Sequence, residues 1–269
     1  MHIMGYEISR TIQDQVCDFD DLAKPFFQQG NKVGCLVLHG IGGTAANVRI
    51  VADALAARGY TVFCPVLPGH GQTVRQLNHS TGKQWLDAVR AGYERLTASG
   101  CTRIYLLGLS LGGILSALLA EEKETAGLVL ISAPIVMKPW LHRARRLSIL
   151  FPFVRYDAGK LERIRTQPRY EQMYEGFAPR KLRDLNRLTH KLRAHLDRIT
   201  CPTLLLQAKY DNKVEPVSVD VFKKGAVHAP SIEVVTLENS PHGSTYGPER
   251  ELAASLCTDF VDRLESARN

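Results

Sequence analysis

The sequence predicts an α/β fold in which helices cover both faces of a mainly parallel, doubly wound sheet. Short apolar runs of strand character alternate with helical patterns over residues 33–134, and the alternation resumes from residue 201. Between these parts, residues 135–200 show helical spacing and no convincing strand. A chain of 269 residues is long enough for one such domain with an insertion.

Each expected element rests on its hydrophobic period and on the turn residues around it. Near-continuous apolar runs are typical of parallel strands that are buried on both faces, and they cover residues 33–38, 60–66, 103–107, 126–132, 203–208 and 232–237. Apolar residues at helical spacing cover residues 45–58, 82–98, 114–120, 218–224 and 248–265. Residues 1–32 are polar and mixed, so we expect no more than an edge strand or a hairpin there.

We expect the chain to divide into a core, residues 1–134 and 201–269, and an inserted helical cap (lid), residues 135–200. The latter is called the inserted segment below. Two amphipathic helices are expected in it, because apolar residues recur on one face of each. The first stripe is Trp140, Leu141, Ala144, Leu147 and Phe151. The second stripe is Leu182, Leu185, Leu188, Leu192 and Leu196.

The net charge of +7 is concentrated in the inserted segment. Residues 138–198 hold 16 Lys and Arg against 6 Asp and Glu, whereas the remainder holds 18 against 21. A local excess of this kind is usually a solvated helix face, and we prefer that interpretation to contact with an anionic membrane surface or an acidic substrate. Nucleic-acid binding would rest on this segment alone, and we predict none.

Composition favours a cytoplasmic protein without a metal centre. No apolar run approaches the roughly 18 residues of a membrane span, and residues 1–12 lack the basic and apolar parts of a signal peptide. The six cysteines are scattered, with no Cys-x-x-Cys pair. They fit small buried side chains in a reducing compartment rather than a zinc site.

The most informative motif is Gly108-Leu109-Ser110-Leu111-Gly112, which lies between a strand-like run and a helical run. A serine at a sharp strand-to-helix turn is the nucleophile-elbow arrangement, in which the flanking residues must be small for strand and helix to pack. Ser110 would then face the positive end of the helix dipole. The alternative interpretation is an ordinary Gly/Ser turn.

A serine nucleophile needs a base and a group that orients the base. Asp211 follows the strand at 203–208, and His242 follows the last strand. Because the carboxyl ends of parallel strands meet at one edge of the sheet, these residues could meet Ser110 there. Glu215, Asp220 and His228 are rivals without this strand-end placement. Taken singly, Asp211 could be a turn former and His242 a solvent-exposed loop residue.

A second glycine-rich loop, His39-Gly40-Ile41-Gly42-Gly43-Thr44, follows the first long strand. A phosphate-binding loop would need a Lys-Ser/Thr pair after the glycines or a Gly-x-Gly-x-x-Gly pattern. Neither is present, so we do not predict nucleotide binding.

The sequence resembles the α/β-hydrolase superfamily, and within it the bacterial carboxylesterase and monoacylglycerol-lipase branch. The matching segments are LVLHGIGGT, PVLPGHG, TGKQWLDAV, LLGLSLGG, HLDRITCPTLLLQAKYD and NSPHG. The resemblance implies the α/β-hydrolase fold, a Ser110, Asp211 and His242 triad, and an oxyanion hole formed by the backbone N–H groups of Ile41 and Leu111. It also suggests that His39 shapes its loop rather than acting as a base, and that His70 sits in a loop near the pocket rim.

The predicted function is a serine hydrolase that cleaves carboxylic esters through an acyl-enzyme, with a small-molecule ester as its partner and no metal or organic cofactor. Short- to medium-chain acyl esters or monoacylglycerols are the expected substrates. The apolar residues of the inserted segment that would accept the acyl chain are Trp140, Phe151, Phe153, Met173, Tyr174 and Phe177. Amidase, thioesterase or acyltransferase chemistry on the same triad, and a hydrolase-like binding protein, stay open. These patterns make no prediction of the oligomeric state.

Overall fold

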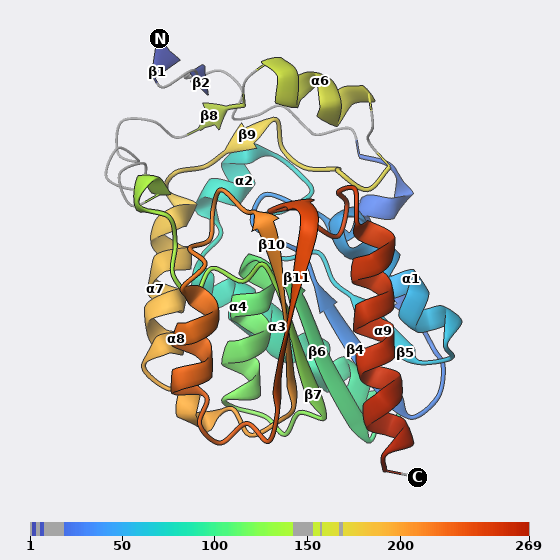
Figure 1. Cartoon of the computed structure of the whole chain (residues 1–269). Coiled ribbons are helices and arrows are strands. Elements are labelled where there is room, and N and C mark those ends of the chain that lie inside the picture. The colour runs from blue at the N-terminus through green and yellow to red at the C-terminus, as the bar shows by residue number, and fades with distance from the viewer. Residues whose placement is uncertain are drawn as a thin grey trace.

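The computed structural model describes residues 2–3, 6–7, 19–141, 153–156, 158–166 and 169–268. Its centre is a seven-stranded sheet with the order β11-β10-β7-β6-β4-β5-β3 (Figure 1). The strands are β3 (Phe26–Gln28), β4 (Val33–Leu38), β5 (Thr61–Cys64), β6 (Arg103–Leu109), β7 (Gly127–Ile131), β10 (Thr203–Tyr210) and β11 (Ile232–Pro241). All neighbours pair in parallel except β3 with β5, so the predicted mainly parallel sheet is confirmed.

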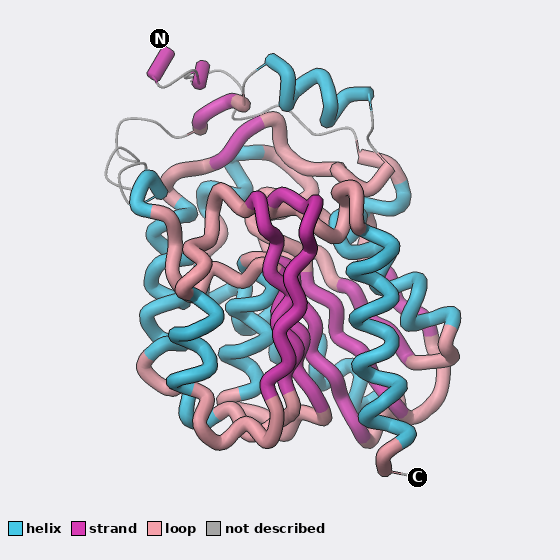
Figure 2. Tube along the Cα trace, viewed as in Figure 1, coloured by secondary structure: helices cyan, strands magenta, loops and turns pink. Residues whose placement is uncertain are grey.

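Helices cover both faces of this sheet, as predicted (Figures 1 and 2). The helices of the core are α1 (Arg49–Ala57), α2 (Val74–His79), α3 (Gly82–Ala98), α4 (Leu111–Ala120), α8 (Ser218–Gly225) and α9 (Arg250–Ser266). Short 3-10 turns occupy Asp21–Ala23, Ala45–Val48 and Leu196–Arg198, so the helix expected from residue 45 begins as a 3-10 turn.

Successive side chains of each strand point to opposite faces of the sheet, so the buried side chains form two separate hydrophobic clusters, one on each face. In β4, Cys35 and Val37 join the cluster that includes α1 and α9, whereas Leu36 and Leu38 join the cluster that includes α3 and α4. All six residues of β4 are buried. Burial on both faces is why this strand reads as a continuous apolar run.

An edge strand or a hairpin was expected in residues 1–32, and the structure contains both. β3 forms the antiparallel edge of the main sheet, and β1 (His2–Ile3) pairs with β2 (Tyr6–Glu7). Helix α2 was not predicted. Its signal is a capping box, in which Thr73 and Gln76 exchange side-chain and backbone hydrogen bonds.

The inserted segment contains strands, so the expectation that it lacks them is wrong. Beside α6 (Ala158–Thr166) and α7 (Lys181–Arg193), it holds the antiparallel pair β8 (Val154–Arg155) and β9 (Gly176–Phe177). Strands of two residues are too short to leave an alternating pattern in the sequence. Figure 1 shows α6, β8 and β9 beyond the ends of β10 and β11. The first predicted stripe lies mostly in residues 142–152, outside the described residues.

The second predicted stripe is confirmed as helix α7 and the 3-10 turn after it, but it does more than cover a pocket. Its leucines belong to the same buried cluster as α3 and α4. Leu188 lies against Gly82 at the start of α3, and Leu196 lies against Gly225 of α8. Helix α7 is therefore packed on the core along most of its length. Its N-terminal end, at Lys181 and Leu182, lines the pocket that also contains Ser110.

Candidate active site

Ser110 occupies the turn between β6 and α4, in a conformation that side chains rarely adopt. Its φ is 52° and its ψ is −114°. The backbone N–H of Ser110 donates to the Ile131 carbonyl of β7 at 2.8 Å, which anchors the turn to the sheet. A strained residue held in this way at a strand end is frequently functional. The side chain lies at the floor of a pocket, and Ser110 is only 5% exposed.

The two glycines of the motif are required by packing, as the sequence predicted. A Cβ on Gly108 would lie 2.2 Å from the backbone carbon of Gly112, and a Cβ on Gly112 would lie 2.2 Å from the Leu38 carbonyl oxygen. Both contacts are with backbone atoms, which have little freedom to move. The strand, the turn and the helix can therefore approach each other only without these side chains.

Gly112→Ala should lower the unfolding free energy by about 3 kcal/mol, because the added methyl group must push α4 away from β4. The measurement is the melting temperature followed by circular dichroism. Gly40→Ala is the matched control, since its Cβ would lie 3.4 Å from the nearest atom, an ordinary contact. Equal melting temperatures for the two variants would contradict the packing argument.

The structure brings Ser110, His242 and Asp211 into one hydrogen-bonded chain. His242 Nε2 lies 2.9 Å from Ser110 Oγ, and His242 Nδ1 lies 2.8 Å from Asp211 Oδ2. Because the carboxylate can only accept, Nδ1 donates the proton to it and Nε2 is left to accept from the serine hydroxyl. The three residues follow β6, β10 and β11, whose carboxyl ends lie at the same edge of the sheet.

Asp211 is held rigidly as an anion. Its side chain is 2% exposed, and its second oxygen, Oδ1, accepts hydrogen bonds from the N–H groups of Lys213 at 2.8 Å and Val214 at 3.0 Å. Burial acts to raise the pKa of the Asp211 carboxyl. The charge and hydrogen bond of His242 and the two backbone hydrogen bonds outweigh it, so the pKa is lowered from 3.8.

The rival residues lie elsewhere. Glu215 forms an ion pair with Lys138 at 3.0 Å, and Asp220 lies exposed in α8. His228 contacts the Asp197 carbonyl through Nδ1 at 2.7 Å, in an exposed position. Among the described residues, no group of three or more His, Cys, Asp and Glu side chains is arranged to hold a metal ion.

Leu111 follows Ser110 directly in the chain, and Ile41 lines the same pocket as Ser110. Leu111 begins α4, where backbone N–H groups have no acceptor within the helix. The loop that carries Ile41 is fixed by His39, whose Nδ1 lies 2.8 Å from the Gly40 carbonyl and whose Nε2 accepts from the N–H of Leu67 at 3.0 Å. Burial lowers the pKa of His39 to about 4, so this imidazole is neutral and serves the loop.

Asn47 is a site residue that the sequence analysis missed. Its side chain donates to the carbonyl of Tyr170 at 2.7 Å and accepts from the N–H of Thr44 at 3.3 Å. Its own carbonyl accepts from the hydroxyl of Thr245 at 2.5 Å. Asn47 thereby ties together the loop of Ile41, the inserted segment and the loop of His242. Its only sequence signal is a polar side chain three residues after Thr44.

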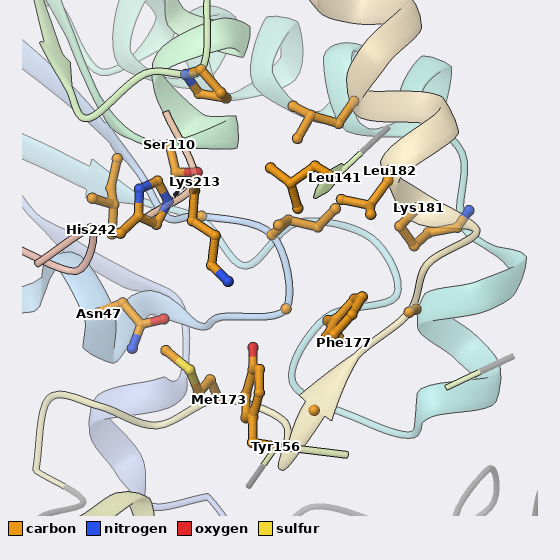
Figure 3. A pocket seen from close by; sticks show the side chains of 18 of the residues that line it. Asn47, Ser110, Leu141, Tyr156, Met173, Phe177, Lys181, Leu182, Lys213 and His242 are labelled. Atoms are coloured by element: carbon orange, nitrogen blue, oxygen red, sulfur yellow. Dashed lines mark hydrogen bonds between the residues drawn. The ribbon is translucent and has the colours of Figure 1, made fainter. Parts of the chain in front are cut away.

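The pocket above Ser110 is mainly apolar and is built from both parts of the chain. Figure 3 shows side chains of the inserted segment, among them Tyr156, Met173 and Phe177, facing Ser110 and His242 across it. The cleft encloses about 920 Å³ of space, a figure that includes its open mouth.

The predicted acyl-binding side chains separate into three groups. Trp140, Met173 and Phe177 line the pocket. Phe153 and Tyr174 do not line it, because both are packed in the core, where the Tyr174 hydroxyl donates to the Gly69 carbonyl at 3.0 Å. Phe151 lies outside the described residues.

Comparison with known proteins identifies the family. Residues 15–255 match the family model described as the alpha/beta hydrolase family. A thermostable monoacylglycerol lipase of Bacillus sp. (strain H-257) is 32% identical over 239 residues, which cover 88% of this chain and 94% of that protein. A carboxylesterase of Bacillus subtilis (strain 168) is 29% identical over 243 residues, with 90% and 97% covered.

Solved structures agree with this result. A structure from the work on the metagenome-derived lipolytic enzymes LipS and LipT superposes with a TM-score of 0.81 at 26% identity and covers 91% of this chain and 100% of that one. The monoacylglycerol lipase of Paleococcus ferrophilus shares the fold, with a TM-score of 0.68 at 17% identity and coverage of 88% and 96%. None of the described helices has the length and apolar character needed to cross a membrane. The resemblance read from the sequence is confirmed, and the chain belongs to the alpha/beta hydrolase family.

Proposed function

We propose that this protein is a serine hydrolase that cleaves carboxylic esters, with Ser110 as nucleophile, His242 as general base and Asp211 as the group that orients the histidine. The observation that carries the proposal is the hydrogen-bonded chain from Asp211 through His242 to Ser110, located in an apolar pocket. The names of the relatives, a monoacylglycerol lipase and a carboxylesterase, support ester hydrolysis over other chemistry on the same residues.

In the first half of the reaction, His242 Nε2 removes the hydroxyl proton as Ser110 Oγ attacks the ester carbonyl carbon. Asp211 keeps the proton of Nδ1 in place and stabilises the positive charge that forms on the imidazole. The N–H groups of Ile41 and Leu111 receive the oxyanion of the tetrahedral intermediate. His242 then returns the proton to the alcohol oxygen, the C–O bond breaks and an acyl-enzyme remains.

In the second half, water takes the position of the alcohol. His242 removes its proton, the hydroxide adds to the acyl carbon, and the intermediate collapses to the carboxylic acid and free Ser110. We assign the core to residues 1–134 and 201–269 and the cap to residues 135–200, which supplies Met173, Phe177 and Leu182 to the pocket wall. These side chains suit a short or medium acyl chain, as a simple ester or a monoacylglycerol.

Hydrolysis of p-nitrophenyl esters of graded acyl length tests the proposal. We expect kcat/KM to pass through a maximum at a short or medium chain, because an apolar wall gains free energy with each buried methylene until the pocket is full. Mass spectrometry after treatment with a p-nitrophenyl phosphonate should locate the covalent adduct on Ser110. Folded protein that turns over no ester would contradict the proposal, and parallel assays with an amide and a thioester would then identify the chemistry.

A further inference from the structure

The charges that line the pocket are unbalanced. Its charged side chains, apart from His242, are Lys160, Lys181 and Lys213, and no Asp or Glu of the described part of the chain lines it. Two of these lysines are engaged locally. Lys181 forms an ion pair with Asp184 at 2.8 Å and donates to the Ser80 carbonyl, and the ammonium of Lys160 lies 3.7 Å from the centroid of the Tyr156 ring.

Lys213 differs from Lys181 because no described carboxylate pairs with it. No carboxylate of the described residues lies within ion-pair distance of its ammonium, and its nearest aromatic contact is the Trp140 ring, with 4.5 Å to the centroid. The Asp211 oxygens nearby are committed to His242 and to backbone N–H groups. In Figure 3 the side chain extends from beside His242 toward the middle of the pocket.

The position of Lys213 is also fixed relative to the reacting atoms. Its N–H donates to Asp211 Oδ1 at 2.8 Å, and its carbonyl accepts from the N–H of Lys138 at 2.8 Å. The Trp140 ring is held in turn by a hydrogen bond from Nε1 to the Asn212 carbonyl at 2.9 Å. The backbone of Lys213 is therefore held in place at the Asp211 site, two residues after the carboxylate that orients His242. The side chain that carries the ammonium extends from this fixed position.

A cation in an apolar pocket that has no ion-pair partner among the described residues costs free energy that a bound anion recovers. We propose that Lys213 recognises an anionic oxygen group, a carboxylate or a phosphate, on the substrate, a few atoms from the ester that Ser110 attacks. This inference rests on the proposed ester hydrolysis and names its substrate class: esters with one anionic group near the scissile bond. Neutral esters are then poorer substrates than their anionic counterparts.

Two matched substrate pairs test this and distinguish the source of the anion. Monomethyl adipate is compared with methyl 6-amino-6-oxohexanoate, which places the charge on the acyl side. A 1-butanoylglycerol 3-phosphate is compared with 1-butanoylglycerol, which places it on the alcohol side. With acid release followed by titration at pH 7, we expect kcat/KM to favour the anionic member of one pair by roughly ten- to a hundredfold, the usual strength of a charged hydrogen bond.

Variants assign the preference to Lys213. Lys213→Met should abolish the ratio between anionic and neutral substrate, Lys213→Glu should reverse it, and Lys213→Arg should retain most of it. Lys209→Met is the matched control. It removes one positive charge from the end of β10, four residues before Lys213, but Lys209 pairs with Glu238 at 2.5 Å and does not line the pocket. A wild-type ratio near one in both pairs, or a ratio that Lys213→Met leaves unchanged, would overturn the inference.

Binding keeps this inference separate from the proposed function. The Ser110→Ala variant, titrated with the same esters by calorimetry, should bind the anionic member more tightly, and the double variant with Lys213→Met should lose that difference. Equal affinities in the single variant would refute the anion site. Tighter anion binding without turnover in the wild type would support the site and contradict ester hydrolysis.

The pH dependence supplies an independent readout. Burial lowers the pKa of Lys213 to about 8, against the opposite effect of Asp211, so the ammonium is charged below that pH and neutral above it. The ratio of kcat/KM between anionic and neutral ester should therefore fall as pH rises through about 8. The other titratable groups that line the pocket are His242, Tyr246, Tyr156, Lys160 and Lys181, and the Lys213→Met variant separates their effect on the ratio from that of Lys213. A ratio that is constant from pH 6 to 10 would contradict the assignment.

Discussion

Ser110→Ala should reduce kcat/KM for a p-nitrophenyl ester by about 10⁴- to 10⁶-fold, the loss seen when a triad serine is removed. The physical reason is that His242 Nε2, 2.9 Å from the hydroxyl, is left without a nucleophile to activate. The remaining rate would come from water attack on an ester held in the pocket. The measurement is steady-state hydrolysis at pH 7.5 with matched protein concentrations and active-site titration.

Ser116→Ala is the control for this substitution. Ser116 lies in α4, the helix that follows Ser110, and is fully buried, and its hydroxyl has no hydrogen-bond partner among the described residues. Removing that hydroxyl should leave both activity and stability close to the wild type. If Ser110→Ala retained more than a hundredth of the wild-type rate, Ser110 could not be the nucleophile.

Asp211→Asn should lower kcat by about 10⁴-fold with little change in the shape of the pocket. The carboxylate accepts from His242 through one oxygen and from two backbone N–H groups through the other. An amide has only one acceptor oxygen. If that oxygen faces the backbone, the amide NH₂ faces Nδ1, the imidazole proton moves to Nε2, and His242 can no longer take the proton of Ser110.

The control for this variant is Asp220→Asn, an exposed position in α8 that should keep full activity. Asp211→Asn should also change how stability responds to acid. The native pKa of Asp211 lies below 3.8, so the carboxylate stabilises the fold above that pH and this contribution is lost as pH falls through the lowered value. The difference in unfolding free energy between wild type and variant should therefore shrink in acid. A constant difference between pH 6 and pH 2 would contradict this.

The sequence alone identified the parts whose signals are local. Five consecutive residues specify the turn at Ser110, because positions 108 and 112 must both be glycine for β6, α4 and β4 to pack together. The main strands were found because burial on both faces makes them continuously apolar. Asp211 and His242 were found by one rule of topology, namely that parallel strands place their carboxyl ends at the same edge.

Tertiary structure alone decided the features that depend on contacts between distant segments. Asn47 joins three segments that are far apart in the chain, and its local signal, a polar side chain three residues after Thr44, indicates a helix start and not these contacts. The pair β8 and β9 is too short to show a period. In the sequence, Lys213 is one lysine in a loop after a strand. Its role in the proposal depends on three contacts that folding creates: the Trp140 ring next to its ammonium, the Asp211 oxygens that are bonded elsewhere, and a pocket wall to which no described residue contributes a carboxylate. The free energy of a charged side chain depends on the charges and the polarity of all groups within several ångströms of it. Folding brings these groups together from segments that are far apart in the sequence.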